Sequence, residues 1–145
     1  MKKLLYLAFA VVFGFTVLSC SDDRDTPINN YEQLPTAAQS FIKEHFSEQR
    51  SVRVERDGNN YEVYLSDGTK VEFSENGQWT EVDAPFGKSI PTGFIPTPIM
   101  DFIAQTYPGQ SINEISRDSR GYDVELINGI DLEFAPDGTF IRVDN

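Results

Sequence analysis

The fold of this chain is decided by residues 61–83, which read YEVYLSDGTKVEFSENGQWTEVD. Apolar and polar side chains alternate along this stretch, and glycine-containing pairs interrupt the alternation at Asp67-Gly68 and Asn76-Gly77. A period of two is typical of a strand with one buried face, and Asp-Gly or Asn-Gly between two such runs indicates a hairpin. We therefore predict three antiparallel strands joined by two tight turns, which we expect to be of type I′.

The same pattern occurs a second time, 61 residues further along, where residues 122–144 read YDVELINGIDLEFAPDGTFIRVD. The match extends towards the N-terminus without a gap, so that residues 34–83 align with residues 95–144 at 16 identical positions out of 50. A repeat at a fixed offset predicts two copies of one structural unit. We place the first copy at residues 34–83 and the second at residues 95–145, joined by a linker rich in proline and glycine at residues 84–94.

An amphipathic helix is predicted at the start of each copy, and a further strand between that helix and the first hairpin, over residues 52–56 and 112–117. The fold class is therefore α+β: two tandem α-β-β-β-β units with antiparallel sheets and helices on one face. Because a unit of this size buries little surface alone, we expect the copies to share a sheet or a core. The helical face recurs at intervals of three and four residues: Ala38, Phe41, Ile42, His45 and Phe46, and then Ile99, Phe102, Ile103, Thr106 and Tyr107.

The N-terminus has the features of a lipoprotein leader. A positive start is followed by an apolar run over residues 4–18, shorter than the roughly 20 residues of a membrane-spanning helix. This run ends at Ser19-Cys20 and resembles the lipobox of bacterial lipoproteins, in which the cysteine is acylated. We predict a signal peptide at residues 1–19, lipidation of Cys20 and a tether at residues 20–33. The alternative is an ordinary secreted protein whose Cys20 lies in a discarded leader or a loose tail.

Composition limits the partners. The chain carries 12 Lys and Arg against 23 Asp and Glu, a net charge of −11, which disfavours a nucleic-acid partner. Its single cysteine allows no disulfide and no cysteine-based metal site within one molecule. The expected location is the bacterial cell envelope, with a lipid anchor in the outer membrane and the folded part in the periplasm or on the cell surface.

The candidate binding site follows from the alternation. If one set of strand positions faces the helices, the other set forms an open face that carries aromatic side chains among charges, a composition typical of protein-binding surfaces. The alternative is that a register shift, a bulge or the linker buries Trp79 and Phe140. The residues expected on the open face are Glu62, Tyr64, Trp79, Glu81, Asp123, Glu125, Phe140 and Arg142.

The sequence offers little support for catalysis. His45 is the only histidine, its counterpart in the second copy is Thr106, and we expect it to cover the core. No phosphate-binding loop, paired-histidine or EF-hand spacing occurs, so we predict no enzyme, cofactor or metal site. Two alternatives stay open at this point: hydrolysis by paired carboxylates, and a weak Ca²⁺ site at the turns of residues 57–60 or 66–68.

The order of these motifs resembles the PepSY-like family of β-lactamase-inhibitor-like proteins. The resemblance rests on the helix, on the two hairpins of residues 61–83 and on their duplication, and it covers residues 34–144. It implies a saddle-shaped sheet, export as a lipoprotein, and a protein-binding or inhibitory role towards a secreted or envelope hydrolase. The family supplies no catalytic residues. The alternative function is a lipoprotein that scavenges a small ligand or Ca²⁺ with its acidic sheet.

Overall fold

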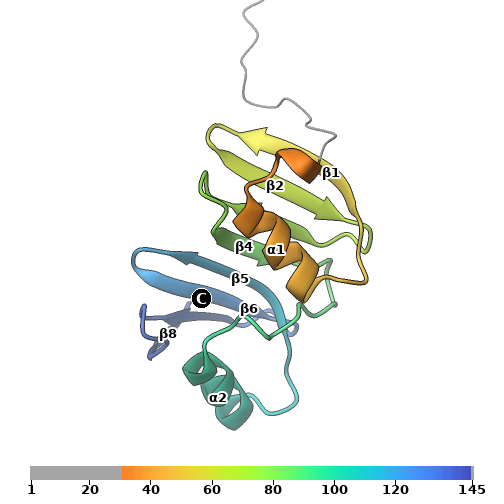
Figure 1. Ribbon diagram of the computed structural model, residues 1–145. Coiled ribbons are helices and arrows are strands. Elements are labelled where there is room, and N and C mark those ends of the chain that lie inside the picture. The colour runs from red at the N-terminus through yellow and green to blue at the C-terminus, as the bar shows by residue number, and fades with distance from the viewer. Residues whose placement is uncertain (1–30, 145) are drawn as a thin grey trace, which may run out of the picture.

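The computed structural model describes residues 31–144, and the predicted signal peptide, Cys20 and the tether up to residue 30 lie outside them. Eight strands form one sheet in the order β1 to β8, and every neighbouring pair is antiparallel (Figure 1). No helix within residues 31–144 is long and apolar enough to cross a bilayer. The elements are η1 (Tyr31–Gln33), α1 (Thr36–His45), β1 (Ser51–Asp57), β2 (Asn60–Leu65), β3 (Lys70–Phe73), β4 (Trp79–Asp83), α2 (Thr97–Thr106), β5 (Ile112–Asp118), β6 (Gly121–Leu126), β7 (Asp131–Phe134) and β8 (Phe140–Asp144).

The α+β class and the duplicated unit are confirmed. The helix α1 precedes β1 to β4, and α2 precedes β5 to β8 in the same order. The two copies share one continuous sheet, because β4 pairs with β5 in a register that places Val82 opposite Ile115. Both of these side chains are fully buried, so the junction between the copies is part of the core.

The helices cover one face of the sheet, and the same contact occurs in both copies. Phe73 and Phe134 are 0% and 1% exposed. The Phe41 ring of α1 meets Phe73 edge-on at 5.7 Å between centroids, and the Phe102 ring of α2 meets Phe134 at 5.6 Å. Complete burial of one such side chain contributes about 1.5–3 kcal/mol. The alternating apolar residues of the strands therefore hold each helix in place.

A bulge in the last strand of each copy corrects one prediction. The register pairs Glu72 with Glu81 but Phe73 with Trp79, which leaves Thr80 as an extra residue in β4. An extra residue inverts the alternation beyond it, so Trp79 lies on the same face as Phe73. Trp79 is only 7% exposed and contacts Phe41 of α1 and Phe94 of the linker. The expectation that Trp79 faces away from the helices is wrong, and the alternative of burial by a bulge is confirmed.

The second copy repeats the bulge. Glu133 pairs with Arg142 and Phe134 with Phe140, so Ile141 is the extra residue of β8. The Phe140 ring stacks on Phe102 of α2 at 4.2 Å between centroids. Phe140 therefore belongs to the helix-covered face, and its expected place on the open face is also wrong.

The hairpin turns differ from the expected type. A type I′ turn needs positive φ at two successive residues, yet within residues 31–144 positive φ occurs only at glycines. At the first hairpin the Gly68 N–H donates to Leu65 O, and the Leu65 N–H donates to Thr69 O. The Asp67 carboxylate accepts from the Thr69 N–H at 2.9 Å. The turn is thus a three-residue loop that ends in glycine, and the same hydrogen bonds recur at Gly77, Gly129 and Gly138.

Two connecting segments are ordered by specific hydrogen bonds. Residues 31–33, the last three of the predicted tether, form η1, and the Tyr31 hydroxyl donates to Gln39 O of α1 at 2.8 Å. The linker is held by the buried side chain of Asn113 in β5, whose Nδ2 lies 2.8–3.2 Å from three carbonyl oxygens and shares its two N–H groups among them. These oxygens belong to Ala84, Pro85 and Lys88. Asn113 is the extra residue at the start of β5, so the bulge positions the linker.

Candidate functional site

The candidate site is the open face, which we define as the two rows of strand residues that point away from the helices. The strand registers set these rows across all eight strands. Together they contain eleven carboxylates and three cationic side chains. The first row is Arg53, Tyr64, Lys70, Asp83, Glu114, Glu125, Asp131 and Asp144, and the second is Glu55, Glu62, Glu72, Glu81, Ser116, Asp123, Glu133 and Arg142.

Lys70 organises the open face of the first copy. Its Nζ lies 2.8 Å from Glu72 Oε1 on its own strand and 2.8 Å from Glu81 Oε1 on β4. Partial burial by itself would lower the pKa of Lys70, but the hydrogen bonds and charges of Glu72 and Glu81 outweigh burial and raise the pKa. Lys70 therefore remains a cation, and it holds two carboxylates of neighbouring strands in fixed positions.

Tyr64 is fixed in the same way, beside Lys70 in the first row. Its hydroxyl donates to Glu62 Oε2 at 2.7 Å, and the Arg53 guanidinium lies 3.8 Å from the centre of its ring. The hydrogen bond to Glu62, together with some burial, raises the pKa of Tyr64 to about 12. Tyr64 thus presents a neutral, immobilised phenol among charged groups. It is the aromatic residue of the predicted binding set that the structure places on the open face.

Glu114 occupies the junction between the copies. It lies opposite Asp83 of β4 and opposite Glu125 of β6, so three carboxylates are neighbours across three strands. Burial, and then the charges of Glu81, Asp83 and Glu125, raise the pKa of Glu114 to about 7. A carboxyl group whose proton dissociates near neutral pH makes the charge of this region sensitive to pH.

The second copy is the more acidic half. A depression of about 160 Å³ that begins at Glu114 is lined by five carboxylates and by Val124 and Leu132. Burial, followed by the charge of Glu133, raises the pKa of Asp123. On β8 the Arg142 Nε lies 2.7 Å from Glu133 Oε2 and offers partial compensation at the edge of the sheet. The five carboxylates belong to Glu114, Asp123, Glu125, Asp131 and Asp144.

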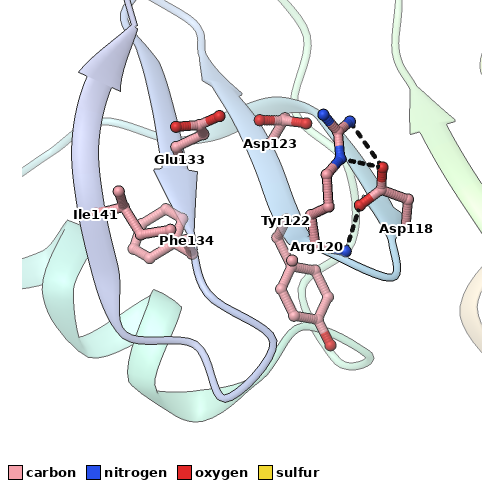
Figure 2. Close-up of a pocket in the computed structure, with 8 residues that line it drawn as sticks. Asp118, Arg120, Tyr122, Asp123, Glu133, Phe134 and Ile141 are labelled. Carbon is pink, nitrogen blue, oxygen red and sulfur yellow. Dashed lines mark hydrogen bonds and ion pairs between the residues drawn. The ribbon is translucent and has the colours of Figure 1, made fainter.

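A smaller hollow of about 80 Å³ lies beside the β5–β6 turn (Figure 2). Here Arg120 Nε donates to Asp118 Oδ2 at 2.8 Å, and the Arg120 backbone N–H donates to Asp118 Oδ1 at 2.7 Å. The hydrogen bonds from Arg120 lower the pKa of Asp118. Figure 2 shows the Arg120 guanidinium on the same side of the sheet as the carboxylates of Asp123 and Glu133, with the Tyr122 ring on the other side.

The structure brings most of the predicted site residues together on one face. Glu62, Tyr64, Glu81, Asp123, Glu125 and Arg142 lie on the open face, whereas Trp79 and Phe140 lie beneath the helices. Sequence reasoning missed Lys70 and Glu114 as organising residues. Lys70 was visible as an outward strand position, but the neighbours of Glu114 depend on the β4–β5 pairing, which the alternation does not reveal.

Two further side chains, His45 and Phe86, lie outside the open face. His45 packs between the rings of Phe41 and Phe94, with centroids 4.7 and 5.2 Å away, as expected for a residue that covers the core. Phe86 in the linker is 95% exposed. It lies in the turn in which the Lys88 N–H donates to Pro85 O and whose carbonyl groups Asn113 binds. The chain thus presents one aromatic ring on a fixed turn at an end of the strands.

The comparisons with known proteins agree with this architecture. Residues 21–67 and 59–142 match the family described as "Putative beta-lactamase-inhibitor-like, PepSY-like". The chain is similar to a crystal structure described as a putative periplasmic protein of unknown function from Bacteroides vulgatus. The two are 32% identical over 83% of this chain and 99% of that chain, with a TM-score of 0.78.

A second similar structure is described as a putative calcium-regulated periplasmic protein from Bacteroides thetaiotaomicron. It is 36% identical over 83% of this chain and 97% of that chain, with a TM-score of 0.78. A third, a putative periplasmic protein also from Bacteroides vulgatus, is 34% identical over 86% of this chain and 99% of that chain, with a TM-score of 0.78. None of the curated proteins matches this chain. The duplicated unit, the family match and these three relatives agree, and the chain belongs to the PepSY-like, beta-lactamase-inhibitor-like family.

Proposed function

We propose that this chain is an exported, lipid-anchored protein-binding module whose open face engages a basic surface of a partner protein. The observation that carries the proposal is the open face itself, on which eleven carboxylates and three cations lie on a rigid sheet that no described helix covers. We infer further that the partner is a secreted or envelope hydrolase that the module inhibits, in keeping with the family description.

Two features of the open face favour a protein partner over a small molecule. The depression on this face has a volume of about 160 Å³ and is lined mostly by carboxylates, whereas small-molecule sites are larger and mostly apolar. The carboxylates of the first copy are held by Lys70 and Tyr64, so little side-chain freedom is lost when a partner binds. Complementary charge raises the association rate and selects the partner, and added salt weakens both effects.

A capture experiment with matched variants tests the proposal. The full chain is used to isolate partners from envelope extract as wild type, as Asp123→Lys/Glu125→Lys, and as Glu44→Lys/Asp101→Lys. Both double variants change the charge equally, but Glu44 and Asp101 are exposed on the helices. Wild type and the helix variant should capture the same partner, while the open-face variant binds it at least about tenfold more weakly. Equal capture by all three forms would contradict an open-face interface.

The inhibitory role has its own test. The captured partner is assayed for hydrolysis with and without the full chain, again as wild type and as the two double variants. Inhibition by wild type and the helix variant, together with its loss in the open-face variant, is the expected result. An unchanged hydrolysis rate with wild type would leave a binding role and contradict an inhibitor.

Export and lipid anchoring are supported by the leader of residues 1–19 and by the periplasmic descriptions of the three similar structures. Two acyl chains anchor a protein stably, whereas one chain binds a membrane only marginally. A Cys20→Ser variant should therefore move from the membrane fraction to the soluble envelope fraction. A variant that stays in the membrane fraction would show that Cys20 is not the anchor.

Calcium binding is a second candidate function. It is favoured by the description of one similar structure as calcium-regulated and by the carboxylate-lined depression beside Glu114. Within residues 31–144, however, no three carboxylate, histidine or cysteine side chains are arranged to hold a metal ion. Calorimetry with Ca²⁺ separates the two functions. Binding that the Asp123→Lys/Glu125→Lys variant removes, in the absence of a protein partner, would favour calcium.

A further inference from the structure

The two outer strands of the sheet, β1 and β8, carry complementary patterns of charge. They lie at opposite ends of the strand order, and each has a neighbour on one side only within the described residues (Figure 1). The backbone groups of an edge strand that point outward can pair with another strand. In the duplicated unit β4 is the counterpart of β8, and β5 is the counterpart of β1. The chain therefore already contains, in its β4–β5 pair, the equivalent of a pairing between β8 and β1.

The internal junction supplies a register. Within the chain, Glu81 lies opposite Ser116, Val82 opposite Ile115 and Asp83 opposite Glu114. Adding the repeat offset of 61 to each β4 position gives its counterpart in β8, and subtracting 61 from each β5 position gives its counterpart in β1. The list then describes contacts between β8 of one molecule and β1 of a second molecule. The resulting pairs are Arg142 with Glu55, Val143 with Val54, and Asp144 with Arg53.

These transferred pairs are complementary where the internal ones are not. Asp83 and Glu114 repel each other at the junction, where the linker holds the strands together. At the two edges, both charged pairs would join opposite charges on the open face. On the helix-covered face Val143 would lie opposite Val54, which is 1% exposed. A shift of the register by two residues in one direction places Arg142 opposite Arg53, and a shift in the other direction places Asp144 opposite Glu55. Both shifts bring like charges together, so the charges select one register.

Exposure supports the same contact. Val143 is 38% exposed, while its counterpart Val82, which has β5 beside it, is fully buried. The Arg142 and Arg53 side chains are 59% and 48% exposed. Each now pairs with a carboxylate of its own copy, Arg142 of β8 with Glu133 of β7 at 2.7 Å and Arg53 with Glu55 on β1 at 3.0 Å. A second copy would join these pairs into one network across the contact.

We propose that β8 of one copy pairs antiparallel with β1 of a second copy of this chain, in the register that joins β4 to β5, and so continues the sheet from molecule to molecule. The contact is head-to-tail, because two different edges meet, and it therefore leaves one free edge at each end for further copies. The open face of each copy would form part of a longer acidic surface, but this assembly does not depend on the proposed partner.

Charge reversal tests the proposal by sedimentation velocity of the full chain, in one non-ionic detergent, under reducing conditions and over a wide concentration range. Wild type should form species larger than the monomer. Arg142→Glu and Glu55→Arg should each associate at least about tenfold more weakly, because each places like charges across the contact. An equal mixture of the two variants should associate again, because position 142 of one variant and position 55 of the other then carry opposite charges across the contact.

The mixture also separates the proposal from misfolding, since a variant that fails to fold cannot be rescued by its partner. The control is an equal mixture of Arg120→Glu and Glu44→Arg, which makes the same charge changes at exposed positions outside β1 and β8 and should behave as wild type. A monomeric wild type, single variants that associate as wild type does, or a mixture that stays monomeric would each overturn the proposal.

Discussion

Arg117 joins the two copies through Trp79. Its Nε donates to the Trp79 carbonyl oxygen at 2.8 Å, while its guanidinium lies 4.0 Å from the centre of the Trp79 ring. One side chain of β5 thus binds both the backbone and the side chain of β4, on the helix-covered face. The counterpart in the first copy, Arg56, only approaches its own neighbour Tyr61, at 5.2 Å. The arginine of the second copy thus binds the first copy, whereas the equivalent arginine of the first copy contacts only its own copy.

We therefore expect Arg117→Ala to lower the free energy of unfolding by about 2 kcal/mol, since a hydrogen bond from a charged donor and a cation–π contact are both lost. Arg117→Lys should recover only part of this, because an ammonium group cannot make both contacts at once. Urea denaturation provides the measurement. Arg56→Ala is the matched control and should cost under about 1 kcal/mol. Equal losses of unfolding free energy for Arg117→Ala and Arg56→Ala would contradict the role of Arg117 in joining the two copies.

Asn113 of β5 should be sensitive to substitution, because its side chain binds the backbone of the linker. Asn113→Ala removes the donor for three carbonyl groups, of which Ala84 O lies in a buried contact. Carbonyl groups left without a partner cost about 1–3 kcal/mol, so we expect a loss of about 2 kcal/mol in thermal or urea unfolding. The counterpart Val52 is 58% exposed, and Val52→Ala should change stability by under about 0.5 kcal/mol. An equally small effect of Asn113→Ala would show that the linker does not depend on it.

Glu114 should make stability depend on pH. Its pKa of about 7 in the folded chain lies above the ordinary value of 4.5, so between these values the folded state binds more protons than the unfolded state. The contribution of Glu114 to stability therefore falls as pH rises from about 4.5 to about 7. Glu114→Gln, which stays neutral, should be more stable than wild type at pH 8 and closer to it at pH 4.5.

Urea denaturation across this pH range measures the effect. Glu48→Gln makes the same charge change at an exposed loop position and should keep the wild-type profile. Parallel profiles for Glu114→Gln and wild type would show that the carboxylates around the junction do not disfavour its charge.

Gly121 should tolerate no side chain. A Cβ atom at this position would overlap the carbonyl oxygen of Phe134, and the φ angle is +146°. Gly121→Ala therefore forces β6 away from β7, and we expect a loss of at least about 3 kcal/mol or failure to fold. Gly129→Ala is the control, because a Cβ atom there meets nothing within 4 Å and only the φ of +78° opposes it. That variant should lose about 1 kcal/mol. Similar melting temperatures for the two variants would contradict this close approach of β6 and β7.

The sequence is sufficient to predict the duplicated unit, because helical and strand periods are local properties that recur at one offset. Phe41 and Phe73 lie on the covered face as the periods require. The bulges at Thr80 and Ile141 are not predictable in this way, because an inserted residue inverts the alternation without changing residue types. The alternation alone therefore places Trp79 and Phe140 on the open face, whereas a bulge, the alternative expectation, places them on the helix-covered face.

The electrostatics of the open face depend on contacts between distant segments. Glu62 and Tyr64 are close in sequence, and the alternation places both on the open face. Glu114, by contrast, acquires its neighbour Asp83 only because β4 pairs with β5. The periodicity of each copy contains no information about which edge of one copy meets the other, so the acidic junction could be found only in the structure.

The assignment of the open face depends most directly on the direction of Trp79, and this residue is the only tryptophan of the chain. Its fluorescence in the folded full chain, with iodide as quencher, therefore reports on one defined side chain. Because Trp79 is 7% exposed, we predict a blue-shifted emission that iodide barely quenches, with a shift to the red and strong quenching on unfolding in urea. A red-shifted, readily quenched emission from the folded chain would place Trp79 on the open face and contradict the account.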